Sequence, residues 1–172
     1  MTVFLDPDTF RTVVASTPLI SIDLVVQNPG GEILLGRRVN RPAQGCWFVP
    51  GGRVLKDETL DGAFERLTED ELGFCRRRSE ASFLGVYEHL YADSVFSAAP
   101  DGGPSTHYVV LGYHLRLDKE SLNGLPRAQH ERYRWWPVDE VSVDPAVHDN
   151  TRAYLPAVTR AAGTAPGRGG IS

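Results

Sequence analysis

The sequence predicts an α+β (mixed α/β) fold, a sandwich in which helices pack against a sheet. β-branched, apolar stretches occur both before and after one central stretch with helical periodicity, and no internal repeat is present. The 172 residues, 41% of them hydrophobic, suit one globular domain with a sizeable core. We expect this single domain over residues 1–163 and a disordered tail over 164–172, which is rich in glycine.

The first elements follow from local signals in the sequence. Asp6 followed by Pro7 is typical of a helix start, with an N-cap and then proline at the first helical position. Asn-Pro-Gly-Gly at 28–31 separates two β-branched stretches and favours a hairpin between them. Trp-Phe-Val at 47–49 predicts a short strand that enters a tight Pro-Gly-Gly loop.

The later elements are predicted in the same way. Helical spacing of apolar residues ends at Gly73, which is typical of a helix C-terminus. Two longer strands follow, joined by an exposed loop at 98–105, and a Tyr-Arg-Trp-Trp strand precedes the last helix. The expected elements are a helix from Asp6–Pro7, strands at 19–27, 32–36 and 47–49, a helix at 60–72, strands at 83–91, 107–117 and 133–136, and a helix at 150–162.

Charge and hydropathy exclude several classes of partner. The chain has 18 Lys and Arg against 22 Asp and Glu, so its net charge of -4 provides no general field for a nucleic-acid backbone. No apolar run approaches the roughly 20 residues of a membrane helix, and the N-terminus lacks the pattern of a signal peptide. We therefore expect a soluble, cytoplasmic protein that binds neither nucleic acid nor membranes, and any anionic ligand should be small.

The central helix places a carboxylate among apolar side chains. At about 100° per residue, Leu60, Ala63, Phe64 and Leu67 share one face, and Glu71 falls inside the same cluster. A buried carboxylate is costly unless a cation or several donors meet it. The helix geometry alone leaves three interpretations open: a metal ligand, a partner of an arginine, or a residue just beyond the core edge.

The segment GGRVLKDETLDGAFERLTEDELGF at 51–74 resembles the signature of the Nudix hydrolases, a loop-helix-loop that binds a metal ion. The positions of that signature are filled here by Gly52, Glu58, Arg66, Asp70, Glu71 and Gly73. The resemblance implies a Nudix-type α/β/α sandwich with a mixed sheet. The chain departs from the pattern at Leu67, where the family has glutamate, and at Asp70, where it has the first of a glutamate pair. We therefore expect Glu71 to be the principal helical ligand of one Mg²⁺.

Over residues 4–154 the chain resembles one Nudix subfamily, the GDP-mannose mannosyl hydrolases. The resemblance is carried by STPLISID at 16–23, LLGRRVNRPAQGCWFVPGGRV at 34–54, THYVVLG at 106–112 and QHERYRW at 129–135. The departures are Cys46, where the subfamily tends to have an aromatic residue, a longer loop at 98–105 and an extended C-terminal tail.

The resemblance assigns roles to individual residues. One Mg²⁺ per subunit, with Mn²⁺ as a substitute, is held by Gly51, Glu71 and Gln129. His130 matches the general base, Arg38 and Arg53 match the arginines on the diphosphate, and Asp23, His89 and Tyr108 match further catalytic positions. Phe4, Leu5 and Phe10 match residues that receive the guanine. The resemblance also implies a homodimer.

The implied reaction is hydrolysis of GDP-mannose, and of GDP-glucose as a further substrate, to GDP and free sugar. Water attacks the anomeric carbon, so the reaction inverts its configuration; imidazole has a pKa suited to accept the proton. Two alternatives stay open: a Nudix pyrophosphohydrolase that yields a nucleoside monophosphate and a sugar 1-phosphate, and a non-catalytic nucleotide-sugar sensor.

Without the resemblance, simpler roles fit the same side chains. His130 lies in a polar run, which favours a solvated loop histidine, and His89 alternates with two tyrosines on a strand, which equally fits a structural role. Only one of the adjacent Arg37 and Arg38 can face a cleft, and we expect Arg38 to do so. Arg41 is expected on the surface.

Overall fold

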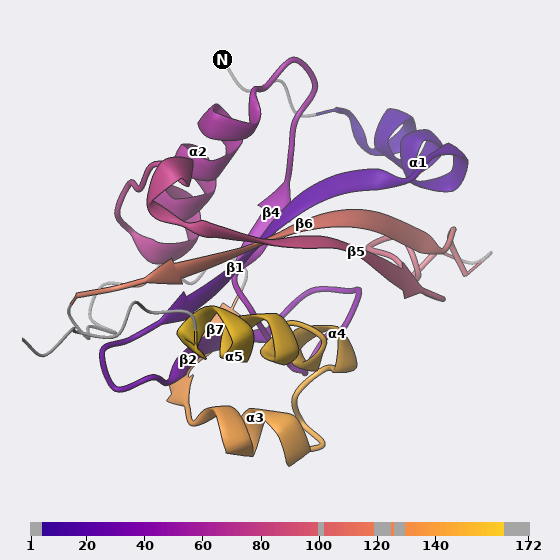
Figure 1. Ribbon diagram of the computed structural model, residues 1–172. Coiled ribbons are helices and arrows are strands. Elements are labelled where there is room, and N and C mark those ends of the chain that lie inside the picture. Colours follow the sequence, from indigo (N-terminus) through magenta and orange to yellow (C-terminus); the bar gives the residue numbers. More distant parts are fainter. Residues whose placement is uncertain (1–4, 100–101, 119–124, 126–129, 164–172) are drawn as a thin grey trace, which may run out of the picture.

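The computed structural model describes residues 5–99, 102–118, 125 and 130–163 of the chain. Helices pack on both faces of a mixed sheet, so the predicted α+β sandwich is confirmed (Figure 1). The elements are α1 (Pro7–Ser16), β1 (Leu19–Gln27), β2 (Ile33–Arg38), β3 (Trp47–Phe48), β4 (Gly51–Arg53), α2 (Leu60–Leu72), the 3-10 turn η1 (Arg78–Glu80), β5 (Ser82–Tyr91), β6 (Thr106–Arg116), β7 (His130–Trp136), α3 (Val138–Val143), α4 (Asp149–Arg152) and α5 (Leu155–Gly163).

Strand β1 is central in the sheet. The order is β3-β2-β1-β6-β5, with β4 also paired to β1 and β7 also paired to β2. The pairing of β1 with β6 is parallel, whereas the other pairs are antiparallel. The predicted hairpin forms at its turn, but β1 and β2 then separate, because β4 pairs with β1 beyond that point and β7 pairs with β2.

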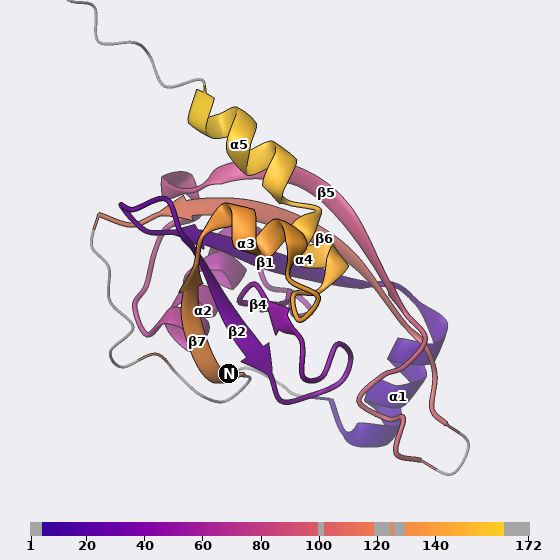
Figure 2. The same ribbon diagram turned by 90° about the horizontal axis from the view of Figure 1, so that it is seen from below.

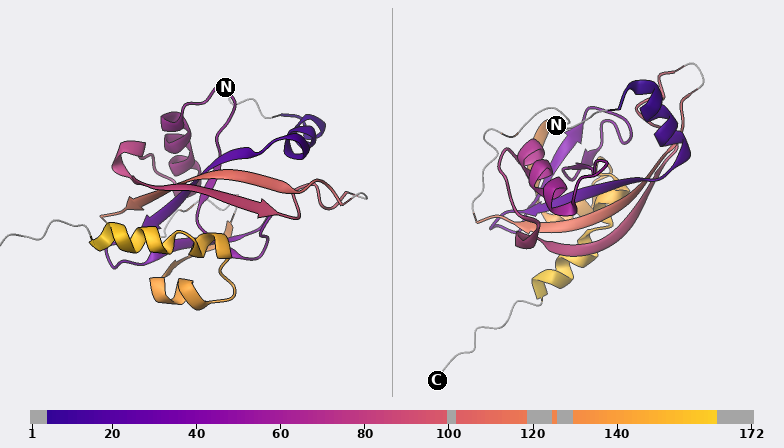
Figure 3. Two further views of the ribbon diagram at one scale, coloured as in Figure 1. Left: turned by 45° about the vertical axis from the view of Figure 1, so that its right-hand side comes forward. Right: turned by 90° about the horizontal axis from the view of Figure 1, so that it is seen from above.

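Two apolar layers follow from the alternation of side chains along β1. Ile22 and Leu24 face α2, whereas Val25 faces the layer formed by α3 and α5. Seen from below, α3, α4 and α5 lie in front of the sheet, and α2 lies behind it (Figure 2). The two further views show the same separation of α1 and α2 from α5 (Figure 3). Asp23, which alternates with Ile22 and Leu24, therefore shares its sheet face with the α3 to α5 layer.

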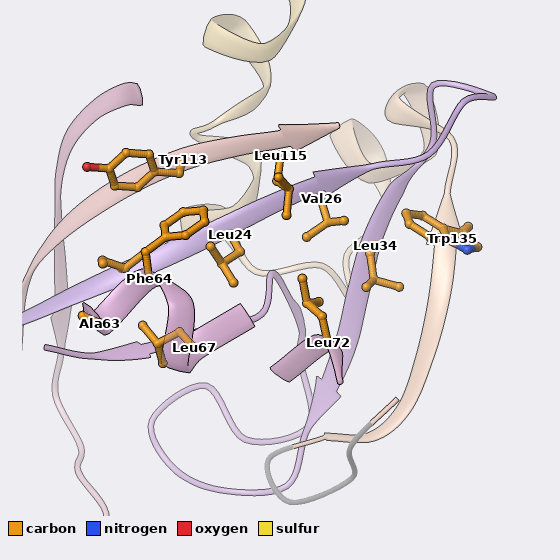
Figure 4. Close-up of a cluster of buried hydrophobic side chains, with 11 residues drawn as sticks. Leu24, Val26, Leu34, Ala63, Phe64, Leu67, Leu72, Tyr113, Leu115 and Trp135 are labelled. Atoms are coloured by element: carbon orange, nitrogen blue, oxygen red, sulfur yellow. The ribbon is translucent and has the colours of Figure 1, made fainter. Parts of the chain in front are cut away.

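Helix α2 has the predicted bounds. The Thr59 side chain accepts the N–H of Gly62 at its start, and Gly73 ends it in the left-handed region at φ 77°. Phe64, Leu67 and the rest of its apolar face pack against the sheet (Figure 4). Leu60 is a correction: it is 38% exposed, because the first turn of α2 lies beyond the edge of the core.

The other differences from prediction are local. The final helix is divided into α4 and α5, because Pro156 in the first turn of α5 lacks the N–H that would continue α4. Helix α3, strand β4 and η1 were not predicted, and β7 begins at residue 130 instead of 133. Trp135 and Trp136 are both buried in the core. None of the described helices has the length and apolarity needed to cross a membrane.

Buried His114 on β6 predicts a loss of stability in acid. Its Nε2 lies 3.0 Å from Gln27 Oε1, and burial, with the charge of Arg116, lowers its pKa to about 4. The folded chain therefore resists protonation of this ring, whereas the unfolded chain accepts a proton near its ordinary pKa of about 6.5. The stabilisation is present above about pH 6.5 and is lost as the pH falls toward about 4.

We expect the free energy of unfolding of the parent, relative to a His114→Gln variant, to fall on the order of 2–3 kcal/mol across this range. Glutamine keeps a polar group beside Gln27 but does not titrate. The measurement is denaturant unfolding of both proteins at a series of pH values. Parallel pH profiles would contradict the assignment.

Candidate active site

A pocket of about 260 Å³ lies where β1, β2, β4, β5 and β6 meet. Its lining combines acidic, basic, imidazole and aromatic side chains with the backbone of the glycine loop. The structure thus brings together residues that are far apart in the sequence. Of the residues predicted for the site, those that line the pocket are Phe10, Asp23, Arg38, Gly51, Arg53, His89 and Tyr108.

The glycine loop lies tightly against β1. Gly51 pairs with Asp23, and a Cβ on Gly51 would lie 2.4 Å from the Ile22 carbonyl oxygen and 2.8 Å from Asp23 Oδ1. Only glycine fits such a contact. A Cβ on Gly52 would lie 2.6 Å from Leu67 Cδ2, so α2 contacts the loop directly as well.

Glu58 and Arg66 join this loop to α2. Arg66 donates from Nε to Glu58 Oε1 at 2.6 Å and from Nη2 to Oε2 at 2.8 Å, and the same Nη2 donates to the Arg53 carbonyl at 2.9 Å. The Leu55 N–H also donates to Glu58 Oε2. These bonds lower the pKa of Glu58, with Arg66 as the main cause. Glu58 therefore links the loop to α2, and Arg66 fixes the orientation of its carboxylate.

Leu67, which departs from the signature, and Glu71, which matches it, are both buried on α2. Leu67 is 2% exposed and packs in the core with Leu24 and Phe64 (Figure 4), so it supplies no ligand. Glu71 is 3% exposed on the same helix, in agreement with the predicted inward position. Burial raises the pKa of Glu71 to about 7; Asp70 adds to the rise, and the charge of Arg38 opposes it.

This environment fits a hard divalent cation. The enclosed Glu71 carboxylate is disfavoured as an anion by burial, which a bound cation would offset, and carboxylate, amide and backbone oxygens are ligands that Mg²⁺ accepts. Gly51 would add its carbonyl oxygen, and Gln129 lies outside the described residues. Among the residues that are described, no group of three or more His, Cys, Asp or Glu forms a metal cluster.

Asp23, Tyr154 and His89 form a buried hydrogen-bonded chain. The Tyr154 hydroxyl donates to Asp23 Oδ2 at 2.7 Å and lies 3.3 Å from His89 Nε2. Burial raises the pKa of Asp23 to about 7, against the opposing effects of the Tyr154 bond and the Arg38 charge. Burial, with the charge of His148, lowers the pKa of His89 to about 4, so this imidazole is neutral at physiological pH.

Sequence reasoning did not find Tyr154. Its bonds reach across 131 and 65 residues of chain, and no local motif surrounds it. The only sequence signal is its place two residues before Pro156, where the predicted helix is interrupted.

The arginines of β2 and of the loop after it take different positions. Arg38 lines the pocket and donates from Nε to the Pro42 carbonyl, whereas the Arg37 Nε donates to the Gly45 carbonyl. Arg41, which was expected on the surface, also lines the pocket and pairs with Asp93 Oδ2 at 3.1 Å. Its side chain is 52% exposed, so the expected surface position is confirmed, and the loop beyond β5 holds it at the rim of the pocket.

Aromatic contacts fix the other end of the pocket. The Arg53 guanidinium lies 4.1 Å from the centre of the Phe10 ring, and the Phe96 ring lies 5.6 Å from the same ring. Leu5 is 49% exposed and does not line the pocket, although we expected it there. Phe4 lies outside the described residues. The backbone of His130 pairs with Arg38 at the start of β7, which brings it to this edge of the sheet.

Sequence comparisons agree with the geometry. Residues 17–158 match the family described as NUDIX domain. A relative from Haloferax volcanii named "Low-salt glycan biosynthesis protein Agl8" is 43% identical over 115 residues, which cover 67% of this chain and 69% of that protein. An "ADP-ribose pyrophosphatase" from Methanocaldococcus jannaschii is 29% identical over 131 residues, covering 67% and 70%.

Solved structures share the fold. A MutT NUDIX hydrolase from Burkholderia pseudomallei, 27% identical, has a TM-score of 0.64 over 83% of this chain and 99% of its own. The NUDIX domain of Shewanella oneidensis NrtR complexed with ADP ribose, 18% identical, has a TM-score of 0.65 over 92% and 94%. The family match, the loop-helix-loop and this fold together establish that the chain belongs to the Nudix family of hydrolases.

Proposed function

We propose that this Nudix hydrolase cleaves GDP-mannose, and GDP-glucose as a further substrate, between the sugar C1 and the diphosphate oxygen, releasing GDP and free sugar. The observation that carries the proposal is the small number of carboxylates that α2 holds in the protein interior. Of its acidic residues, only Glu71 is buried, and Leu67 fills the core where the Nudix signature has a glutamate. Asp61 pairs with Arg78, and Asp70 pairs with Arg66 at 3.4 Å.

A site with one carboxylate ligand suits cleavage at carbon. Mg²⁺ held by Gly51, Glu71 and Gln129 would neutralise negative charge on the diphosphate. Arg38 and Arg53 line the pocket and would bind the same group through charge-assisted hydrogen bonds. Because GDP is then a weakly basic leaving group, it departs without a proton, and the acid of the usual glycosidase pair of carboxylates is not needed.

The incoming water requires a base. His130 is our candidate, because its backbone pairs with Arg38 at the edge of the sheet that carries the pocket. An imidazole in this role would accept the proton as water attacks C1 from the side opposite GDP. The product sugar should therefore begin with inverted anomeric configuration.

The names of two relatives favour different candidates. The 43% identical relative is named for glycan biosynthesis, which favours a substrate that carries a sugar. The relative named "ADP-ribose pyrophosphatase" favours the second candidate, a pyrophosphohydrolase that would form GMP and sugar 1-phosphate. A sensor without catalysis, the third candidate, is opposed by the buried Glu71 and by the set of polar side chains in the pocket.

Product analysis in ¹⁸O-labelled water separates these candidates. With GDP-mannose or GDP-glucose and Mg²⁺, we expect unlabelled GDP and a sugar that carries ¹⁸O at C1, detected by mass spectrometry. Proton NMR at early times should show the β anomer. Label on phosphorus, with GMP as product, would replace the proposal by the pyrophosphohydrolase. Binding of GDP-mannose without turnover would favour the sensor.

The resemblance to the subfamily supports two subsidiary proposals, one Mg²⁺ per subunit replaceable by Mn²⁺ and a homodimer. The glycine-rich composition of the tail supports a third, a domain limited to residues 1–163. Metal stoichiometry by isothermal titration and mass by sedimentation equilibrium test the first two. A chain truncated after residue 163 should keep the parent unfolding temperature. A lower temperature would extend the domain into the tail.

A further inference from the structure

Tyr154 is held in one place by packing. The residue is 0% exposed and lies at the break between α4 and α5. Its ring contacts the Tyr87 ring edge-on, with centroids 4.6 Å apart. A Cβ on Gly112 would lie 3.0 Å from Tyr154 Cε1 and 3.0 Å from Tyr87 Cε2, so glycine on β6 leaves the space that the ring occupies. The hydroxyl therefore has little freedom to move.

The hydrogen bonds of this hydroxyl have a defined direction. A tyrosine has one O–H, and the 2.7 Å bond to the acceptor Asp23 Oδ2 uses it. Toward His89 Nε2, 3.3 Å away, the Tyr154 oxygen can then only accept. A neutral imidazole carries one N–H, so when Asp23 is ionised a hydrogen bond between these two atoms requires the His89 proton on Nε2 and leaves Nδ1 as an acceptor.

We propose that Tyr154 is a positioning residue of the active site, which fixes the rotamer of Asp23 and the Nε2–H tautomer of His89 through this directed chain. Asp23 and His89 both line the pocket, whereas Tyr154 lies behind them and does not. Their side chains come from β1 and β5, which do not pair with each other. Tyr154 thus joins two separate strands behind the pocket. The effect on turnover rests on the proposed function; the effect on the tautomer does not.

The residues around His89 agree with a neutral ring. The rings of Phe48 and Tyr91 pack against it, with centroids 5.8 Å and 6.2 Å away. The charge of His148 also lowers the pKa of His89, and the His148 ring contacts the rings of Phe48 and Tyr91. Burial among these rings removes water from the imidazole and so disfavours a second proton on it.

The first test is the tautomer itself. In ¹⁵N-labelled parent protein without substrate, long-range ¹H–¹⁵N correlation at about pH 8.5, where Asp23 with its pKa of about 7 is ionised, should show His89 protonated on Nε2, with the resonance assigned through a His89→Asn variant. Tyr154→Phe should remove the preference for this tautomer. A proton on Nδ1 in the parent would overturn the proposal, whether or not the variant folds.

The second test separates positioning from general structure. Tyr154→Phe should lower kcat about ten-fold and leave KM within about two-fold, because one hydrogen bond to pocket residues is lost while the ring remains. Tyr87→Phe is the matched control, since Tyr87 packs against the same ring and its hydroxyl bonds to no described residue. It should keep the parent kcat and the His89 tautomer.

The outcomes distinguish the two proposals. If the parent turns over GDP-mannose and folded Tyr154→Phe has an equal kcat, the positioning role is wrong. If the parent does not turn over GDP-mannose but His89 shows the Tyr154-dependent tautomer, the proposed substrate fails while the directed chain stands. An equal loss of kcat in Tyr87→Phe would reduce Tyr154 to a packing residue and would overturn the proposal.

Discussion

Replacing Glu71 with glutamine is expected to lower kcat at least about 100-fold and to weaken the dependence of activity on Mg²⁺. Glutamine keeps the shape of the side chain but removes the charge. No other acidic side chain of α2 is buried, so no neighbour on the helix can take over. The measurement is a set of initial rates over a titration of Mg²⁺, for parent and variant at saturating GDP-mannose.

Glu65→Gln is the matched control, because Glu65 is an exposed residue of the same helix. It should keep both the rate and the metal titration of the parent. An unchanged metal titration in Glu71→Gln would place the ion elsewhere. A loss of activity of equal size in both variants would point to the charge of the helix as a whole instead of to a ligand.

Replacing His130 with glutamine should have an effect of similar size, with kcat roughly 100-fold lower or more and KM within about two-fold. Glutamine cannot accept a proton from the attacking water, but it is a polar side chain of similar size. The measurement is steady-state kinetics with GDP-mannose, together with a substrate-binding titration of the variant. Binding close to that of the parent would show that the loss is in turnover.

The control for His130 is His107→Gln. His107 is half-exposed on β6, lies 3.8 Å from Glu88 and does not line the pocket. It should retain the parent kcat. Equal turnover of His130→Gln and the parent at neutral pH would remove His130 from the mechanism and leave the base to be found among the pocket residues.

Local signals predicted much of the fold because they act over a few residues. Asp6 caps α1 through a bond to an amide three residues on, and Gly73 ends α2 through its own backbone conformation. Periodicity likewise placed Glu71 inside, since it depends only on the helix repeat. It failed for Leu60, because the pattern does not reveal where the sheet ends beneath the first turn.

From local pattern alone the site was predictable only where it lies on a contiguous motif, whereas the resemblance to the subfamily also indicated Asp23, Arg38 and His89, which line the pocket. The loop-helix-loop residues are adjacent in sequence, and their order indicated Glu58, Arg66 and Glu71 together. Tyr154 and the Arg41–Asp93 pair depend on chain segments that meet only after folding. A carboxylate and a phenol that are 131 residues apart leave no pattern that a single sequence can display.

The contact between Leu67 and Gly52 bears on how this chain could change over evolutionary time. The leucine contacts the loop so closely that a glutamate in its place would insert a charge between apolar residues, at an expense of several kcal/mol. A single Leu67→Glu substitution, which would place the glutamate of the signature at this position, would therefore lower the stability of the fold. Changes in the surrounding core would have to accompany it, so the packing of α2 against the glycine loop opposes the gain of a second buried carboxylate on this helix.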